Sequence, residues 1–258
     1  MLATLPMYLR AETRAAHDAF YALIRDVLRD TGQPAPDRLD HVTPHTATWT
    51  RADLLLGQIC NLPYRAHVHR HTHRVGTCDY ALPDTPPGHY FSYFVTRADD
   101  PRDTPAAFAH GRLAVNEAHS HSGWGAAWNY GRDHGFAFTK AVLTGAHSAS
   151  AIALVEGRAD IACIDAISWQ MIQRYDATAP RLRIIARTAP SPGQTLITAR
   201  GNDPAALRRA VDAALIALPA PHRETLMLRG VVTLPDAAYH DLPLPEPVPI
   251  DLPTARSA

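Results

Sequence analysis

The residues whose types and spacing best suit chemistry lie in segment 116–135, NEAHSHSGWGAAWNYGRDHG. Ser120 and Ser122 flank His121, and Gly123 follows directly, just before a predicted helix. A helix start leaves several backbone N–H groups without internal partners, and the peptide dipoles add partial positive charge there. Hydroxyl groups and a glycine at that point suit an anion lying against the helix end. The alternative is an ordinary serine N-cap.

Two further polar residues occupy corresponding points of the next βα units. His147 falls in the first turn of a predicted helix, and Asp165 lies at the carboxyl end of a predicted strand. In open α/β sheets, ligands bind beyond the carboxyl ends of the strands, near helix N-termini. We therefore expect Ser120, Ser122, His147 and Asp165 to converge on one crevice. The alternatives are a surface histidine at 147 and an N-cap at Asp165.

The elements that must position these residues alternate between strand and helix, which indicates an α/β fold. Segment 33–52 is expected to be an irregular loop, Asn61 and Pro63 a turn, and the proline-rich tail from Leu242 extended. The predicted strands lie at 2–5, 53–57, 72–77, 90–96, 113–115, 138–142, 160–164, 182–186 and 195–198, and the predicted helices at 12–29, 122–134, 146–156, 166–175 and 204–218.

Composition excludes several classes of protein. The 258 residues include 25 basic and 25 acidic side chains, so no nucleic-acid or anionic-membrane surface is indicated. Three widely spaced cysteines argue against a disulfide framework or a structural zinc site. No apolar run is long enough to span a bilayer. The N-terminus lacks the pattern of a secretory signal, so we expect a cytoplasmic protein, or a periplasmic one whose leader was removed.

The histidine-rich segment 67–73 invites a metal interpretation. His67, His69, His71 and His73 stand at alternate positions, and on a strand they would share one face. Arginines are interspersed, however, and no carboxylate or thiolate has a suitable spacing. A solvated basic stretch is therefore favoured, and neither a metal nor a cofactor is expected. The role of this segment stays open.

The chain resembles the PhnD-like phosphate, phosphite and phosphonate substrate-binding proteins of ABC transporters, which have the type 2 periplasmic-binding-protein fold. The resemblance extends from the N-terminus to about Leu218. The family's Ser-Thr-Ser motif, which holds phosphonate oxygens at a helix start, corresponds to Ser120-His121-Ser122 followed by Gly123. Its helix-opening histidine corresponds to His147, and its tyrosine at the first interlobe strand corresponds to Tyr90.

Two departures from the family pattern bear on the ligand. His121 replaces the central threonine of the serine motif. The acidic residue that holds the ligand amine in aminoalkylphosphonate binders falls near Ile167, with Asp165 as the nearby replacement. Gln58 and Tyr8 are expected at the ends of the first lobe's strands, facing the ligand.

The resemblance implies an α/β protein of two doubly wound lobes joined by two crossing strands. We expect lobe one at 1–88 with 200–258, lobe two at 98–187, and hinge strands at 89–97 and 188–199. The expected function is capture of a small oxyanion, a phosphonate or phosphate-like compound, between the lobes for an ABC permease. We expect a monomer that closes on its ligand and has no catalytic activity.

Three other functions remain open. The first is a leaderless cytoplasmic enzyme of the same fold acting on a small anionic metabolite, with His147 or Asp165 as general acid or base. The second is a cytoplasmic ligand sensor. The third is a binder of an organic heterocycle or a sulfonate.

Overall fold

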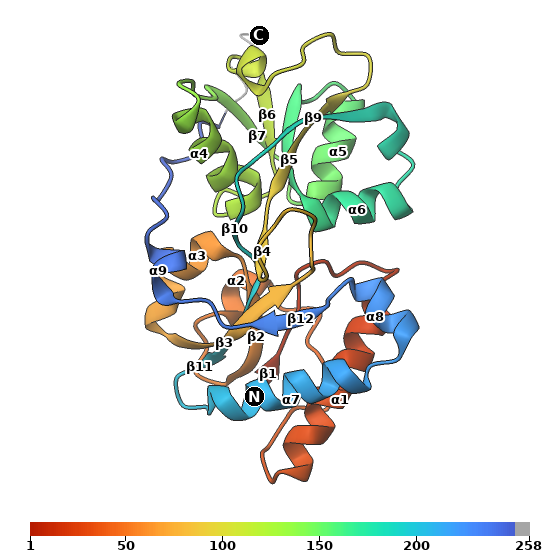
Figure 1. Ribbon diagram of the computed structural model, residues 1–258, viewed down its shortest axis with the longest axis vertical. Coiled ribbons are helices and arrows are strands. Elements are labelled where there is room, and N and C mark those ends of the chain that lie inside the picture. Colours follow the sequence, from red (N-terminus) through yellow and green to blue (C-terminus); the bar gives the residue numbers. More distant parts are fainter. Residues whose placement is uncertain (251–258) are drawn as a thin grey trace, which may run out of the picture. The chain divides into compact units, whose positions relative to one another are not determined.

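The structure, a computed structural model, describes residues 1–250 and divides into two compact units. Unit 1 comprises 1–90 and 191–242, and unit 2 comprises 91–190 with the described residues 243–250. Each unit has its own five-stranded sheet with flanking helices (Figure 1). The expected α/β alternation is therefore present in both units.

The sheet of unit 1 has the strand order β1-β2-β11-β3-β12. β1 runs parallel to β2, whereas β11 runs antiparallel to both β2 and β3. A two-stranded ladder joins β4 to β10. The strands of unit 1 are β1 (Leu2–Ala3), β2 (Leu54–Ile59), β3 (Thr72–Asp79), β4 (His89–Tyr90), β10 (Ser191–Pro192), β11 (Thr195–Ala199) and β12 (Gly230–Val232).

The helices of unit 1 cover this sheet with amphipathic faces. α1 buries Phe20, Ile24 and Leu28, spaced four residues apart, and packs against α7 and α8. Asp203 caps α7, whose first residue is Pro204, as predicted from the sequence. The helices are α1 (Arg14–Asp30), α2 (His45–Thr48), α3 (Asn61–Ala66), α7 (Pro204–Ala217), α8 (Ala220–Leu226) and α9 (Asp236–His240), with a 3₁₀ turn at Val68–Arg70.

The sheet of unit 2 has the order β7-β6-β8-β5-β9, and β7, β6 and β8 run parallel. Its strands are β5 (Ser92–Arg97), β6 (Arg112–Val115), β7 (Lys140–Leu143), β8 (Ile161–Asp165) and β9 (Leu182–Arg187). Its helices are α4 (Ala126–Asp133), α5 (His147–Val155) and α6 (Ala166–Tyr175), with a π-helical turn at His121–Gly125 and 3₁₀ turns at Pro105–Phe108 and Ala179–Arg181.

Both faces of the unit 2 sheet are buried, as the strand sequences require. Along β8, Ile161 and Cys163 belong to one hydrophobic cluster, whereas Ala162 and Ile164 belong to another. Trp124 and Ala127 join the first cluster, and residues of α5 and α6 join the second. Side chains alternate between the faces of a strand, so helices lie on both faces of a doubly wound sheet.

Several local expectations are corrected. The predicted turn at Asn61 and Pro63 is the helix α3, because a proline in the first helical turn costs no internal hydrogen bond. The expected loop 33–52 contains the short helix α2. The predicted strand at 90–96 is divided at Phe91 into β4 and β5, and β5 lies inside the unit 2 sheet between β8 and β9. The elements α8, β12 and α9 were not predicted.

The proline-rich tail differs from its expected place in lobe one. Residues 243–250 group with unit 2, where Ala141 N donates to Pro249 O and Ile250 forms a parallel bridge with Ala141. The chain therefore passes between the units three times along its sequence, after Tyr90, after Pro190 and after Leu242. The two expected hinge segments overlap strands of the units' own sheets, β5 and β11.

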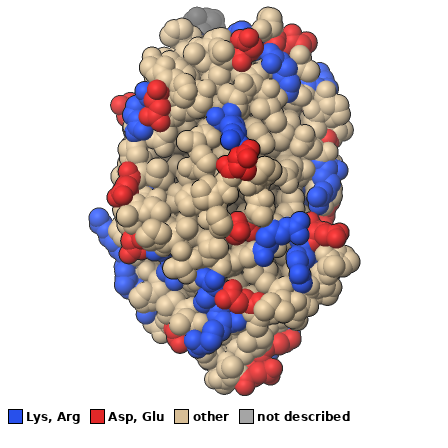
Figure 2. All heavy atoms as spheres, viewed as in Figure 1, with Lys and Arg blue, Asp and Glu red and all other residues tan. Residues whose placement is uncertain are grey.

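Charged side chains of both signs are interspersed on the face seen in Figure 2. This distribution agrees with the balance of 25 basic and 25 acidic residues. Over residues 1–250, none of the helices combines the length and the hydropathy that a bilayer crossing requires.

Candidate functional site

Three parallel strands of unit 2 end at the same edge of their sheet. β6 ends at Val115 and leads to the turn His121–Gly125, β7 leads to the first residue of α5, His147, and β8 ends at Asp165 itself. The register of these strands aligns their carboxyl ends. Parallel strands followed by helices place loop residues and helix N-termini together at that edge. This edge is the candidate site.

The two serines lie against each other at the start of the turn. Ser120 is the N-cap, and its Oγ accepts a hydrogen bond of 3.1 Å from Gly123 N. Ser120 Oγ and Ser122 Oγ are 3.3 Å apart, and both side chains are buried. The N-cap alternative is thus the actual conformation of Ser120. A capping oxygen only accepts, so the cap leaves the Ser120 hydroxyl proton available as a donor.

His147 connects the serines to Asp165. Its Nε2 lies 2.9 Å from Ser122 Oγ and 3.2 Å from Asp165 Oδ2, while its Nδ1 is buried without a partner among the described residues. Burial holds the pKa of His147 below its usual value, against the opposing charges of Asp165 and Glu117. The ring is therefore neutral near pH 7.

The neutral ring fixes the direction of these hydrogen bonds. A carboxylate can only accept, so the proton of His147 belongs on Nε2, facing Asp165. Ser122 Oγ then accepts from the same N–H, and one of the two serine hydroxyls donates its proton to the other. The cluster therefore offers one free hydroxyl donor in the unliganded protein, and an anion that replaced the Ser120–Ser122 hydrogen bond would receive both hydroxyl protons.

Asp165 is engaged by the helix that it caps. One carboxylate oxygen accepts from Ile167 N at 3.0 Å and Ser168 N at 2.8 Å, and the other accepts from Ser168 Oγ at 2.5 Å. The N-cap alternative for this residue is its observed conformation. Its second contact is with the ring of His147.

Gly123 and His121 are packed rather than exposed. A Cβ atom at Gly123 would lie 2.0 Å from Asn116 Oδ1, so the backbone approach at this point requires glycine. His121 is buried, and a Cβ at Gly125 would lie 2.9 Å from its Nδ1. The packing of the Asn116 side chain against Gly123 was not predicted. The position of Asn116 directly after the parallel strand β6 is the signal that could have indicated it.

The geometry of Ser122, His147 and Asp165 differs from that of a nucleophilic triad. In a triad the histidine uses one ring nitrogen for the serine and the other for the carboxylate. Here both contacts are made by Nε2. With its proton on Nε2, the neutral ring has no basic nitrogen facing Ser122 that could take the hydroxyl proton.

Gln58 and Tyr8, which were expected from lobe one, and Tyr90, which was expected on a hinge strand, all lie in unit 1. Gln58 and Tyr8 both line a small cavity of about 20 Å³. Gln58 Nε2 lies 3.6 Å from Cys78 Sγ, and Tyr8 has a left-handed backbone, with φ of 66°. Tyr90 is buried, with its hydroxyl 3.8 Å from Cys60 Sγ, and is not among the residues that line this cavity.

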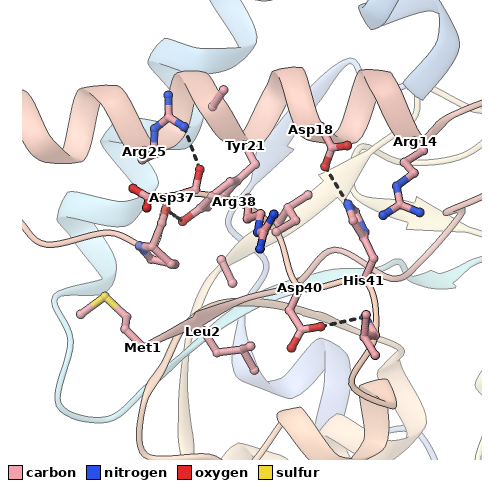
Figure 3. Close-up of a pocket in the computed structure, with 15 residues that line it drawn as sticks. Met1, Leu2, Arg14, Asp18, Tyr21, Arg25, Asp37, Arg38, Asp40 and His41 are labelled. Atoms are coloured by element: carbon pink, nitrogen blue, oxygen red, sulfur yellow. Dashed lines mark hydrogen bonds and ion pairs between the residues drawn. The ribbon is translucent and has the colours of Figure 1, made fainter.

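A larger pocket of about 830 Å³ lies in unit 1 between α1 and the loop at 36–42 (Figure 3). Three arginines and three aspartates line it, so their formal charges cancel. Asp18 binds His41 Nε2 at 2.6 Å, and Asp37 binds Arg29. The negative charges of its carboxylates offset the positive charges of its guanidinium groups. This pocket is therefore less suited to an oxyanion than the serine cluster.

The alternate histidines do not share one strand face. His69 lies in the 3₁₀ turn Val68–Arg70, and only His73 belongs to β3. Within residues 1–250, His67, His69, His71 and His73 take part in no group of three potential metal ligands.

The model of a family described as periplasmic substrate-binding proteins of phosphonate ABC transporters matches residues 56–233. No curated protein sequence matches the chain.

Several solved structures share the fold. PhnD1 from Prochlorococcus marinus in complex with methylphosphonate has a TM-score of 0.70 at 11% identity, covering 93% of this chain and 94% of its own. XAC2383 from Xanthomonas citri bound to ATP has a TM-score of 0.68 at 14% identity, with coverage of 93% and 94%. The binding-protein component PA3383 of a Pseudomonas aeruginosa ABC phosphonate transporter has a TM-score of 0.67 at 13% identity, with coverage of 93% and 82%.

These structural matches confirm the expected type 2 periplasmic-binding-protein fold. The family match extends over more than half of the chain and includes the serine cluster, His147 and Asp165. The chain belongs to the family of periplasmic substrate-binding proteins of phosphonate ABC transporters.

Proposed function

We propose that this protein captures a phosphonate or a closely related oxyanion at the serine cluster of unit 2 and delivers it to an ABC permease. The observation that carries the proposal is the arrangement of Ser120, Ser122 and His147 at the carboxyl edge of three parallel strands. The family's description, which names phosphonate and an ABC transporter, agrees with it.

The donors of the cluster suit a tetrahedral oxyanion. The hydroxyls of Ser120 and Ser122 converge within 3.3 Å of each other, beside the start of the helical segment that begins at His121. Hydrogen bonds to a charged acceptor contribute roughly 1.5–3 kcal/mol each, and the helix start adds partial positive charge. An anion at this position would also lie close to His147, the first residue of α5, where the N-terminus of a second helix adds partial positive charge.

His147 completes the proposed site as a ring that can gain a proton. Its Nδ1 is a buried nitrogen without a partner in the described chain, and its side chain is 10% exposed. Such a nitrogen costs free energy in the free protein. A bound anion would favour its protonation, because the positive ring then faces both the anion and Asp165.

We infer a binding protein rather than an enzyme. Ser122 and Asp165 share a single protonated ring nitrogen of His147, so the ring is not placed to accept the Ser122 proton, and Asp165 is held as a helix cap. Closure of the two units on the ligand is part of the proposal. The family is described as periplasmic, and fractionation of cells that express the whole gene tests this compartment.

Titration calorimetry with methylphosphonate, inorganic phosphate and ATP tests the proposal. Ser122→Ala should weaken methylphosphonate binding about tenfold or more, as the loss of one charge-assisted hydrogen bond requires. Thr96→Val is the matched control: it removes a buried hydroxyl of the same unit, bonded to Asp160 O, near the opposite end of β8. Equal affinities in wild type and Ser122→Ala would place the oxyanion site elsewhere.

A further inference from the structure

The described tail, residues 243–250, lies along unit 2 and reaches the serine turn. Trp124 Nε1 donates a hydrogen bond of 2.6 Å to Glu246 O. Val248 packs against the hydrophobic cluster that contains Trp124, and Ala141 N donates to Pro249 O at 2.8 Å. The tail thus contacts both the turn and the edge strand β7.

Trp124 is the residue through which the tail meets the candidate site. It directly follows Gly123 within the turn His121–Gly125 and is 3% exposed. Its ring belongs to a buried hydrophobic cluster, while its Nε1–H donates to Glu246 O of the tail. Ser122 and Trp124 belong to the same five-residue turn, so its backbone links the tail contact to the serine.

The composition of the tail suits this contact. Prolines occupy positions 243, 245, 247 and 249, and proline restricts the unbound chain while favouring extended backbone in the residue before it. Prolines lack N–H groups, so the tail offers mainly carbonyl acceptors. The contacts at Glu246 and Pro249 are both made by carbonyl oxygens.

We propose that the tail is a strap that holds Trp124, and through it the serine turn, in the conformation that binds the oxyanion. Trp124 is then a positioning residue, because its contact is with the tail and its effect is exerted through Ser120 and Ser122. This inference rests on the proposed function of the serine cluster.

The expected loss of affinity depends on the fraction of molecules in which the serine turn has its binding conformation. Apparent affinity falls in proportion to the fraction of molecules in the binding-competent conformation. One buried hydrogen bond contributes about 0.5–1.5 kcal/mol, so its loss shifts that fraction by at most about tenfold. The strap should therefore modulate affinity without abolishing binding.

Trp124→Phe tests the strap, with Trp169→Phe as the matched control. Both tryptophans lie in unit 2 and are 3% exposed, but Trp169 Nε1 has no hydrogen-bond partner in the described chain. The two substitutions remove similar ring volume, and only the first removes a donor to the tail. We expect Trp124→Phe to weaken methylphosphonate binding about three- to tenfold relative to Trp169→Phe.

A second pair of variants leaves both tryptophans intact. Val248→Ser weakens the packing of the tail on the core, whereas Leu244→Ser changes a tail residue that is 57% exposed. We expect the first to weaken binding and the second to leave it unchanged. Hydrogen exchange should become faster at 120–125 in Trp124→Phe and Val248→Ser, while exchange in α6 stays as in wild type.

The results distinguish a failure of the strap proposal from a failure of the proposed binding site. Equal affinities and equal exchange at 120–125 in Trp124→Phe and Trp169→Phe would overturn the strap, even where Ser122→Ala still weakens binding. Unchanged binding in Ser122→Ala would instead overturn the proposed function.

Discussion

Ser122 and His147 are joined by a hydrogen bond of 2.9 Å between Oγ and Nε2, although 25 positions separate them in the sequence. The turn after β6 supplies the first residue and the start of α5 supplies the second. The bond forms because parallel strands bring their carboxyl ends to one edge. It joins the hydroxyl that we propose as a ligand donor to the ring that we propose gains a proton.

Ligand binding should be coupled to proton uptake by His147. Burial lowers the pKa of this ring in the free protein, so the ring is neutral near pH 7. An adjacent oxyanion raises that pKa, and binding therefore takes up protons at pH values between the free and bound pKa. Calorimetry in two buffers of different ionisation enthalpy measures the uptake.

His147→Gln is the control for protons taken up by the ligand itself. The affinity of wild type relative to this variant should rise as the pH falls from 8 towards 6.5, the usual pKa of the ring. Identical proton uptake in the two proteins would remove His147 from a charged role. The neighbouring groups Asp165 and Glu117 are the same in both.

Gly123→Ala should damage the serine turn. Its Cβ would meet Asn116 Oδ1 at 2.0 Å, so either the turn or the asparagine must move. Overpacking of this kind costs about 1–3 kcal/mol, and we expect loss of both stability and phosphonate affinity. Thermal unfolding and calorimetry measure the two effects.

Gly201→Ala is the comparison for this substitution. No atom lies within 4 Å of a Cβ at Gly201, and its φ is not in the left-handed region. The Gly201→Ala variant should have the same unfolding temperature and the same phosphonate affinity as wild type. Wild-type affinity in Gly123→Ala would show that the spacing of the turn is not needed for binding.

Much of unit 2 could be predicted because its sequence alternates in a regular way. Short apolar strands precede polar helix starts, and this pattern predicts the positions of Ser120, Ser122, His147 and Asp165 at one sheet edge. The contact between Trp124 and Glu246 spans 122 positions and is made by a backbone oxygen, so no side-chain pattern signals it. The assignment of the tail to unit 2 could not be predicted for the same reason, because its contact with β7 is also made by a backbone oxygen.

The expectations for unit 1 were less specific. Pro63 suggested a turn, but it lies in the first turn of α3, where the chain has no hydrogen bond to lose. Tyr8 and Gln58 line one cavity of unit 1, which periodicity alone could not indicate. Their contact with a ligand, and that of Tyr90, stay predictions.

Closure of the units should be visible in solution. Ligand binding favours a closed form only through contacts that the open form lacks, and a preference of a few kcal/mol is sufficient. We expect the radius of gyration from X-ray scattering to fall when methylphosphonate is added. Ser122→Ala at the same methylphosphonate concentration should show a smaller change. A tightly bound ligand that leaves the scattering curve unchanged would count against a hinged binder.

The conformation of Asp165 predicts which phosphonates are preferred. Both of its oxygens accept hydrogen bonds from the first turn of α6, and it faces His147. A carboxylate engaged in this way is poorly placed to hold the amine of an aminoalkylphosphonate. We therefore expect 2-aminoethylphosphonate to bind no more tightly than methylphosphonate.

Asp165→Asn tests this expectation, because asparagine caps a helix about as well as aspartate does. The ratio of the two affinities should stay unchanged in Asp165→Asn, since the carboxylate serves the helix and His147 rather than a ligand amine. If the carboxylate held the amine, its loss would weaken 2-aminoethylphosphonate selectively, by about tenfold or more. Asp165→Ala removes the helix cap as well as the charge, so it should also lower the free energy of unfolding by about 1 kcal/mol. Comparison with Asp165→Asn therefore separates the effect of the cap from that of the charge.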